Sequence, residues 1–374
     1  MIEFQHGGVH EKLKPRRLLC ADVPDFLQRS LPRTPARSRR DWQVELGDTL
    51  LFDAPGLRQL EAAIAGYAGP ASRLKFSLAP SAEALRDYYS HNCFQSAGQV
   101  LLPITAFRAG CSRDDSLETL QIALPELSTA IHFPRALAPP GMQRTPLALL
   151  LPYSCDHDLL FANQIAIISN IAACVRSAPW IGWRALFARR RGSLRQRAPL
   201  YWTRIHPSAC IHPTAVIEGS IIGADCRVGA HCVVRYSVLG QHVVLQDGAK
   251  VEFSAVDDHS WLMHDLTFYR SVAERNVFLI HGPYQFSYFQ HTSAAFATIM
   301  MDYRPDARPI AIATPAGVRK YEGRFLGALL EERARIFGGT LTAPGITIPA
   351  ERELFASHVV RARDLLPAPG PDVP

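Results

Sequence analysis

The sequence lacks the features that mark secreted, membrane-spanning or small disulfide-bonded proteins. Its eight cysteines include no C-x-x-C pair, and 374 residues are too many for a small disulfide scaffold. No apolar run approaches the roughly 18–20 residues of a membrane span. The opening stretch MIEFQHGGVHEKLKPRR has no apolar segment after its charges, unlike a secretory signal. We therefore expect a cytoplasmic protein with reduced thiols and no membrane partner.

Strong charge of one sign is also missing, which argues against a nucleic-acid partner. The net charge is only +6, and the dense basic segment ARRRGSLRQRAP at 188–199 is short. A charged run of this kind is typical of a solvated linker. With 48% hydrophobic and 20% charged residues, the composition favours a folded protein of about two domains.

Residues 205–255 carry a repeat that fits neither the helix period of 3.6 nor the strand period of 2. Aliphatic residues recur with spacings that repeat as 6, 6 and 5, at Ile205, Ile211, Ile217, Ile222, Val228, Val234, Leu239, Leu245 and Val251. The residues four places after each are apolar or cysteine, and most are small. We interpret each hexad as a short strand and a turn, with three hexads closing a triangular coil. Since one coil cannot bury its apolar face, the coils must stack.

This pattern resembles the left-handed parallel β-helix of hexapeptide-repeat proteins, and the resemblance covers roughly residues 205–352. A six-residue spacing returns near the end of that range, at Leu330, Ile336, Thr342 and Ile348. Cys226 and Cys232 fall on equivalent corners of consecutive hexads. Because a buried cysteine behaves as a small hydrophobe, we expect both thiols in the core.

The hexad register weakens between these two sets of aliphatic residues. The stretch VFLIHGPYQFSYFQHTSAAFATIMMDYRPDARPI is rich in aromatic and β-branched residues, which predicts strand. Phe286, Tyr288 and Phe289 are too large for an ordinary corner. We therefore expect an irregular segment at 257–325, either a distorted coil or a loop that leaves it. The β-helix domain as a whole is expected to span 201–360, with a disordered proline-rich tail at 361–374.

The first half of the chain predicts a small α/β domain and a helical connector. The segment DTLLFDAPGLRQLEAAIAGYAG indicates a strand followed by a helix, and GQVLLPITAF and LETLQIALP are strand-like. We place this domain at 1–150. The connector, at 151–200, holds a helix at 155–175, a second helix WIGWRALFARRR, and the basic linker.

An α/β region, the segment PYSCDHDLLFAN with its helix, and a β-helix follow one another along the chain. This order resembles sugar-1-phosphate nucleotidyltransferases fused to hexapeptide domains, in which a P-W-D-L-x-x-A-N-like segment joins the halves. That family binds nucleotide with an N-terminal glycine-rich loop, whose backbone N–H groups approach the phosphates. This sequence has no such loop. We therefore expect a degenerate nucleotidyltransferase-like domain that does not transfer nucleotides.

The hexapeptide resemblance implies acyl transfer, because most proteins of that kind are acyltransferases. Their donor is an acyl-thioester, acyl-CoA or an acyl carrier protein, which lies in a groove between subunits. A histidine beside the coil is the general base toward the hydroxyl or amine of the acceptor, a role that suits imidazole near neutral pH. We therefore expect a homotrimer or homodimer that acylates a small polar metabolite or a sugar and holds no tightly bound cofactor.

Eight histidines lie between residues 206 and 291, and four of them occupy outward turn positions of regular hexads: His206, His212, His231 and His242. The other four lie in or beside the irregular segment, where a regular scaffold commonly carries its site: His259, His264, His281 and His291. Our candidates for the base are His281 and His291. Asp302 is expected to orient the ring, and Gln285, Arg304 and Arg308 are expected to bind substrate.

Two other functions remain open at this point. The hexapeptide-fold carbonic anhydrases bind zinc with three histidines on adjacent coils, and His259, His264 and His281 are the residues for such a site here. The alternative is a non-catalytic protein that binds a sugar nucleotide or assembles a partner enzyme.

Overall fold

The computed structural model divides the chain into two compact units, residues 1–176 and 177–374. It describes residues 2–6, 17–18, 21–31, 42–78, 100–108, 111, 116–131, 141–177, 202–304, 306, 308–314, 317–355 and 359–360. The expected helix WIGWRALFARRR, the basic linker and the tail at 361–374 lie outside these residues. Within them, no helix is long and apolar enough to cross a membrane.

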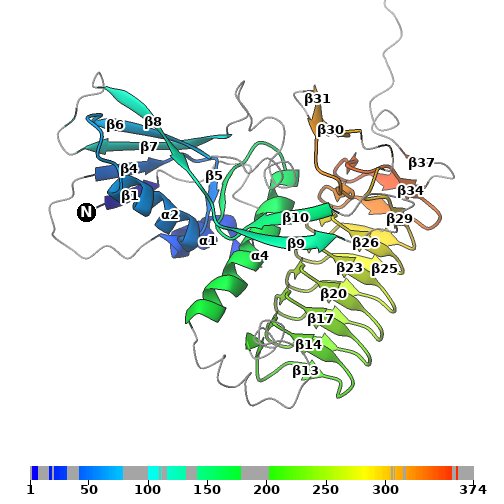
Figure 1. Cartoon of the computed structure of the whole chain (residues 1–374). Coiled ribbons are helices and arrows are strands. Elements are labelled where there is room, and N and C mark those ends of the chain that lie inside the picture. Colours follow the sequence, from blue (N-terminus) through cyan, green and yellow to red (C-terminus); the bar gives the residue numbers. More distant parts are fainter. Residues whose placement is uncertain are drawn as a thin grey trace, which may run out of the picture. The chain divides into compact units, whose positions relative to one another are not determined.

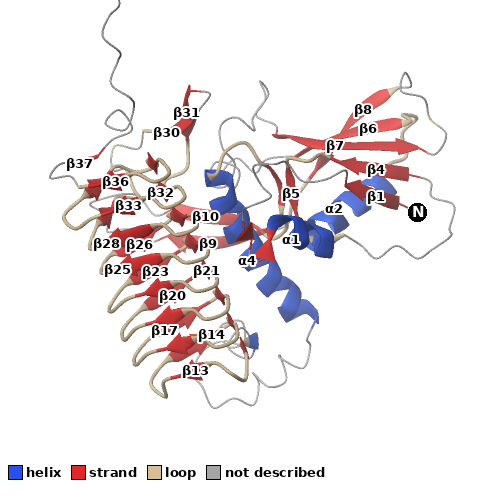
Figure 2. Ribbon diagram, turned by 180° about the vertical axis from the view of Figure 1, so that it is seen from behind, coloured by secondary structure: helices blue, strands red, loops and turns tan. Residues whose placement is uncertain are grey.

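The first unit is built on a mixed five-stranded sheet with the order β1-β4-β7-β6-β8 (Figure 2). Its strands are β1 (Ile2–His6), β4 (Trp42–Leu46), β6 (Arg73–Leu78), β7 (Val100–Arg108) and β8 (Leu117–Ile122). Three small antiparallel pairs accompany the sheet: β2 (Arg17–Leu18) with β3 (Ala21–Asp22), β5 (Leu50–Phe52) with β11 (Leu150–Pro152), and β9 (Glu126–Ile131) with β10 (Gly141–Pro146). The expected α/β character is confirmed, whereas the nucleotidyltransferase-like order stays a prediction.

The described residues of this unit include the helices α1 (Val23–Ser30), α2 (Ala54–Ala65) and α4 (His157–Ser177). Asp53 caps α2, and the two oxygens of its buried carboxyl join three segments. Oδ1 accepts hydrogen bonds from the backbone N–H of Gly56 at 2.7 Å and of Leu149 at 3.0 Å. Oδ2 accepts from the hydroxyl of Ser169 in α4 at 2.5 Å. Burial raises the pKa of Asp53, and these hydrogen bonds oppose that shift.

The second unit is a left-handed parallel β-helix, as the sequence predicts (Figure 1). Its first sheet contains β12 (Arg204–Ile205), β15 (Ile221–Ile222), β18 (Val238–Leu239), β21 (Ala255–Val256), β24 (Val272–Ala273), β27 (Tyr288–Phe289), β32 (Leu329–Leu330) and β35 (Thr347–Ile348). Its second sheet contains β13 (Cys210–Ile211), β16 (Arg227–Val228), β19 (Val244–Leu245), β22 (Trp261–Leu262), β25 (Phe278–Ile280), β28 (Ala294–Phe296), β33 (Arg335–Ile336) and β36 (Glu353–Leu354).

The third side is divided into two sheets. It contains β14 (Val216–Glu218), β17 (Val233–Arg235), β20 (Lys250–Glu252), β23 (Thr267–Tyr269) and β26 (Pro283–Gln285), followed by β29 (Ile299–Met300), β34 (Leu341–Thr342) and β37 (Val359–Val360). We name the three corners of the triangle by what they join. The first edge joins the first sheet to the second, the second edge joins the second sheet to the third side, and the third edge returns to the first sheet.

The corners have left-handed backbone conformation, which non-glycine residues adopt only rarely. Fifteen described non-glycine residues have positive φ, among them His242 at 55° and His259 at 61°. At most of these corner residues the backbone N–H donates to a carbonyl of the preceding coil, for example from His242 to Ala224 at 2.8 Å. At Asp225 and His231 it donates instead to the hydroxyl of Ser208 or Thr214. These hydrogen bonds offset the local strain, so the coil tolerates ordinary side chains at its corners.

From Ile222 to Val251 the aliphatic positions lie inside the coil, as expected, and Cys226 and Cys232 are fully buried. On the first coil Ile205 is 47% exposed, and Ile211 and Ile217 are partly buried. The third edge differs from the expectation of a small apolar corner residue. The residues expected at this corner lie in strands of the first sheet instead, where they pair with one another: Ile221, Val238 and Ala255. Each of them directly precedes an inward-facing aliphatic residue. The buried corner residue is a serine, at Ser220, Ser237, Ser254, Ser271 and Ser287. The five-residue step brings this serine, rather than the residue after it, to the corner.

The parallel register continues through the aromatic stretch, so the expected irregular segment at 257–325 is wrong in its first part. Val272 pairs with Tyr288 after 16 residues, where earlier coils take 17. The coil accommodates Tyr284 in its core by shortening the second edge. Gly282 is required there, because a Cβ would lie 2.8 Å from the Tyr284 ring and 2.9 Å from the Thr298 carbonyl oxygen. The chain leaves the coil only at 301–328, where β30 (Ile310–Thr314) and β31 (Gly317–Tyr321) form an antiparallel hairpin.

Replacement of a corner serine should measure how much this buried column contributes. The hydroxyl of Ser254 donates to the Glu252 carbonyl at 2.8 Å and accepts from the Ser271 N–H at 3.0 Å. Ser254→Ala leaves that buried N–H without a partner, so we expect the free energy of unfolding to fall by about 2 kcal/mol. Thr214→Ala is the matched control, because Thr214 accepts the His231 N–H at 2.9 Å on an exposed corner. Urea denaturation that shows equal losses for both variants would contradict this account.

His157 predicts a loss of stability at low pH. Burial lowers its pKa to about 4, against an ordinary value of 6.5. The neutral ring is favoured in the folded protein, so its contribution is complete above pH 6.5 and is lost as the pH falls toward 4. We expect wild type to lose about 2 kcal/mol more between pH 7 and pH 5 than His157→Met, measured by denaturant unfolding at each pH. Equal losses would show that another group controls the acid sensitivity.

Candidate functional site

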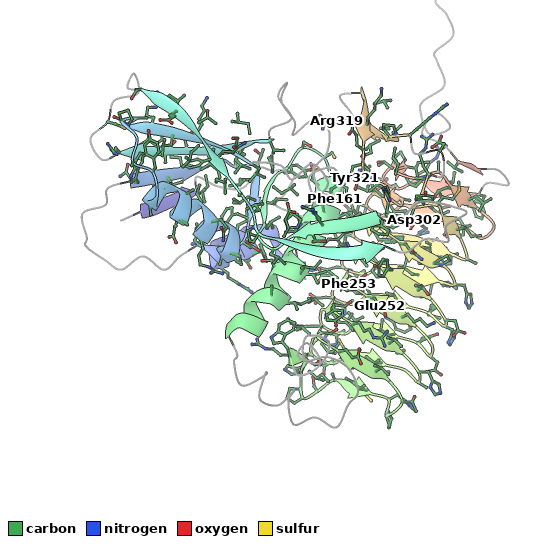
Figure 3. All side chains as sticks on the ribbon, in the orientation of Figure 1. Phe161, Glu252, Phe253, Asp302, Arg319 and Tyr321 are labelled. Atoms are coloured by element: carbon green, nitrogen blue, oxygen red, sulfur yellow. The ribbon has the colours of Figure 1, made fainter. Side chains whose placement is uncertain are left out.

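The histidines of the β-helix are divided between two edges. His206, His242, His259 and His291 lie on the first edge, and His212, His231, His264 and His281 lie on the second. The residues expected to form one catalytic group are therefore separated. His291 lies between β27 and β28 on the first edge, and His281 lies between β25 and β26 on the second. Asp302 follows β29 on the third edge, which also carries Phe253 (Figure 3).

Asp302 does not orient a histidine ring in this fold. Its backbone carbonyl accepts the N–H of Leu326 at 2.8 Å, which ties the two ends of the 301–328 excursion together. Burial raises the pKa of its carboxyl group. The expected pairing of Asp302 with His281 or His291 is therefore wrong, because different edges of the coil carry the three residues.

The expected substrate-binding residues are also distributed. Gln285 ends β26 on the third side, whereas Arg304 and Arg308 belong to the excursion. Arg304 donates from Nε and Nη2 to the two carboxylate oxygens of Asp306, at 3.0 and 2.5 Å, and from Nη1 to the Pro309 carbonyl at 3.2 Å. Its guanidinium is thus occupied within its own loop. None of the three is brought to the first edge.

His291 has the ring geometry of a general base. Its Nδ1 lies 3.1 Å from the carbonyl oxygen of Arg275, one coil earlier. A carbonyl oxygen only accepts, so Nδ1 carries the proton and donates it, and Nε2 keeps a lone pair. The ring is partly buried, which limits its alternative orientations. This backbone carbonyl, rather than an acidic side chain, fixes the tautomer.

A buried carboxylate supports the backbone of His291. Glu274 is 1% exposed. Its Oε1 accepts the hydroxyl of Tyr288 at 2.7 Å, and its Oε2 accepts the backbone N–H of His291 at 3.0 Å. Glu274 thus anchors the backbone of the loop that carries His291.

The histidines proposed for zinc do not converge. His264 and His281 stack on the second edge with ring centroids 6.4 Å apart, but His259 lies on the first edge. Among the residues that the structure describes, no group of three histidine, cysteine, aspartate or glutamate side chains could hold a metal ion. The zinc alternative therefore has no ligand set in this part of the chain.

An open groove of about 520 Å³ lies along the first edge and the adjoining second sheet, over the first four coils. One wall is a column of corner residues, Ser208, Asp225, His242 and His259, and the other is a column of strand residues, Cys210, Arg227, Val244 and Trp261. Successive members of each column are 17 residues apart, one circuit of the coil. The imidazole Nε2 of His242 lies 3.9 Å from Asp225 Oδ2, and its ring stacks on His259 at 4.8 Å between centroids.

The sequence contains the signal for this groove, although the hexad reading did not use it. The spacings 6, 6 and 5 sum to 17, so residues 17 apart must be neighbours on adjacent coils. Asp225, His242 and His259 follow that rule, and so do Arg227, Val244 and Trp261. The 17-residue period therefore places His242 beside His259, whereas the hexad pattern predicts only that His242 occupies an outward turn.

The sequence matches no family model and no curated protein. Three solved structures are similar to part of the chain. The acetyltransferase domain of PglB from Neisseria gonorrhoeae with acetyl coenzyme A is 16% identical, with 47% of this chain and 63% of that chain covered and a TM-score of 0.17. A hexapeptide transferase family protein from Anaplasma phagocytophilum is 13% identical, with 42% and 72% covered and a TM-score of 0.16. A UDP-N-acetylglucosamine acyltransferase from Campylobacter jejuni is 12% identical, with 39% and 68% covered and a TM-score of 0.15. Similarity of this extent gives no substrate, so the site is argued from its own residues.

The tautomer of His291 can be tested directly. We expect nitrogen NMR of protein labelled at histidine to show Nδ1 protonated and Nε2 unprotonated at pH 8, because the Arg275 carbonyl accepts only from Nδ1. His281 is exposed and is the internal control, with the tautomer mixture of a free imidazole. Selective loss of one signal in His291→Gln assigns the resonance. A proton on Nε2 of His291 would contradict the geometry.

Proposed function

We propose that this protein transfers an acyl group from a thioester donor, acyl-CoA or an acyl carrier protein, to a hydroxyl or amine of a small polar acceptor. The observation that carries the proposal is the hydrogen bond from Nδ1 of His291 to the Arg275 carbonyl. It leaves Nε2 as an acceptor, on a loop whose backbone N–H is anchored by Glu274. The reaction class comes from the resemblance of the sequence to hexapeptide-repeat enzymes, and the base comes from the geometry.

The proton and bond changes balance within this arrangement. Nε2 of His291 accepts the proton of the acceptor hydroxyl or amine while that oxygen or nitrogen attacks the thioester carbonyl. The bond from the carbonyl carbon to the acceptor forms, and the bond from the same carbon to sulfur breaks. The leaving sulfur takes the proton from the imidazolium, which returns His291 to its starting tautomer.

The described histidines differ in how suitable they are for this role. His206 and His212 place Nδ1 2.9 Å from the hydroxyl of the serine or threonine two residues later, as a turn contact on the exposed surface. His281 has only the loose stack on His264. Among the histidines that the structure describes, His291 is the one whose ring contacts a backbone carbonyl, and this contact supports it over His281.

The matched pair His291→Gln and His281→Gln tests the proposal. Removal of a general base typically costs 10²–10⁴-fold, so we expect about 10²–10³-fold lower kcat for His291→Gln. His281→Gln should stay within about twofold of wild type, because His281 lies on another edge. The measurement is release of free thiol from acetyl-CoA and longer acyl-CoAs, with pooled amino sugars and amino acids as acceptors.

Native mass spectrometry separates failure of binding from failure of catalysis. A dimer or trimer that gains one acetyl-CoA per subunit, in wild type and in His291→Gln alike, would support the proposal. Binding of nucleotide sugars alone, with no thiol release from any acyl-CoA, would refute acyl transfer and favour the non-catalytic alternative. Equal turnover by both variants would remove His291 from the reaction.

A further inference from the structure

We propose that the groove over the first four coils is a carbohydrate-binding site. Its walls do not include His291, so the proposal stands or falls independently of acyl transfer. Three properties of the groove indicate such a ligand. One wall carries an exposed indole, the walls offer both hydrogen-bond donors and acceptors, and their fixed charges balance.

Trp261 provides the apolar platform. It lies in the second sheet between Val244 and Phe278, and 46% of it is exposed although it forms one wall of a concave groove. A pyranose ring has an apolar face of C–H groups that packs flat on an aromatic ring, where dispersion and the negative π face both favour it. The exposed indole of Trp261, with polar groups beside it, is therefore a suitable platform for the apolar face of a sugar ring.

The corner wall supplies the hydrogen bonds that sugar hydroxyls need. A hydroxyl both donates and accepts, so its site must offer groups of both kinds. On the corner wall, Asp225 is a pure acceptor, and the imidazole of His259 has one nitrogen of each type when neutral. Arg227, on the strand wall, is a pure donor, so sugar hydroxyls can be paired in either direction across the groove.

The backbone of the corner wall is already fixed before any ligand binds. The Asp225 N–H donates to the hydroxyl of Ser208 at 2.9 Å, and the His259 N–H donates to the Gln241 carbonyl at 2.9 Å. The His242 N–H is held in the same way by Ala224. A site whose backbone does not need to be ordered loses less free energy on binding, which suits a weakly bound neutral ligand.

Charge and spacing distinguish this ligand from a polyanion. The groove has one fixed positive group, Arg227, and one fixed negative group, Asp225, so phosphates would gain little there.

Adjacent strands in a sheet are about 4.8 Å apart, close to the length of one pyranose ring. A groove that repeats its wall over four coils therefore fits two or more sugar units in line better than a compact metabolite.

Isothermal titration and saturation-transfer NMR of the full chain test the proposal. The probes are glucose, N-acetylglucosamine, cellobiose, maltose and chitobiose, with acetyl-CoA titrated separately. We expect saturable binding of at least one disaccharide. Trp261→Ala should weaken it by at least about tenfold and Trp261→Phe by less than about threefold, because a phenyl ring keeps the platform. Phe355→Ala, which removes another exposed ring outside the groove, should leave binding unchanged.

A second pair of variants tests the polar wall. Asp225 and Asp265 are both exposed corner residues, with φ of 56° and 51°, and only Asp225 lines the groove. Asn tolerates this backbone conformation, so Asp225→Asn should lose about tenfold in affinity while Asp265→Asn retains it. Absence of saturable saccharide binding by wild type would overturn the proposal. So would binding that survives Trp261→Ala and Asp225→Asn, or a Trp261→Ala defect confined to acetyl-CoA. Unchanged thermal melting shows that the variants are folded.

Discussion

The hydrogen bond from each left-handed corner to the coil before it is the interaction on which the β-helix depends. Without it, a non-glycine residue at positive φ would be strained and would leave a backbone N–H unpaired. With it, residues as different as His242 and Phe253 occupy the same kind of corner. The backbone N–H of the corner residue makes the stabilising contact, so this contact does not depend on the side chain of that residue. Corner columns are therefore where this fold can carry polar chemistry without loss of its core.

The fold could be predicted from the sequence because inward residues are constrained more strongly than corners. The spacing of 6, 6 and 5 predicts the coil from Ile205 onward, and buried Leu330 and Ile348 confirm its return. The aromatic stretch could not be assigned by the same rule. Hexad reasoning assumes a fixed coil length, whereas the coil around Tyr284 omits one corner residue to make room for its ring. Volume in the core, rather than the hexad itself, sets the length of each coil.

The site was harder to predict, because nearness on this scaffold depends on the edge rather than on distance along the chain. His281 and His291 are ten residues apart in the sequence but lie on different edges, whereas Asp225 and His242 are 17 apart and face each other. The role of His291 as a base stays a prediction, and the group that orients its ring is the Arg275 carbonyl rather than Asp302. Backbone partners of this kind leave no trace in residue types, so sequence reasoning could not find them.

The coil separates the two properties that a binding or catalytic site needs. Rigidity comes from backbone bonds between coils and from corner hydroxyls such as those of Ser208 and Ser254, which accept backbone N–H groups of the next coil. Chemistry comes from the other side chains that stand on that frame. Glu274 belongs to the frame, because its side chain joins Tyr288 to the His291 backbone. A carboxylate that is 1% exposed is expensive unless it is fully bonded. Both oxygens of Glu274 accept hydrogen bonds, one from the Tyr288 hydroxyl and one from the His291 N–H, so its burial is compensated and the loop that carries His291 is held by a side chain as well as by the backbone.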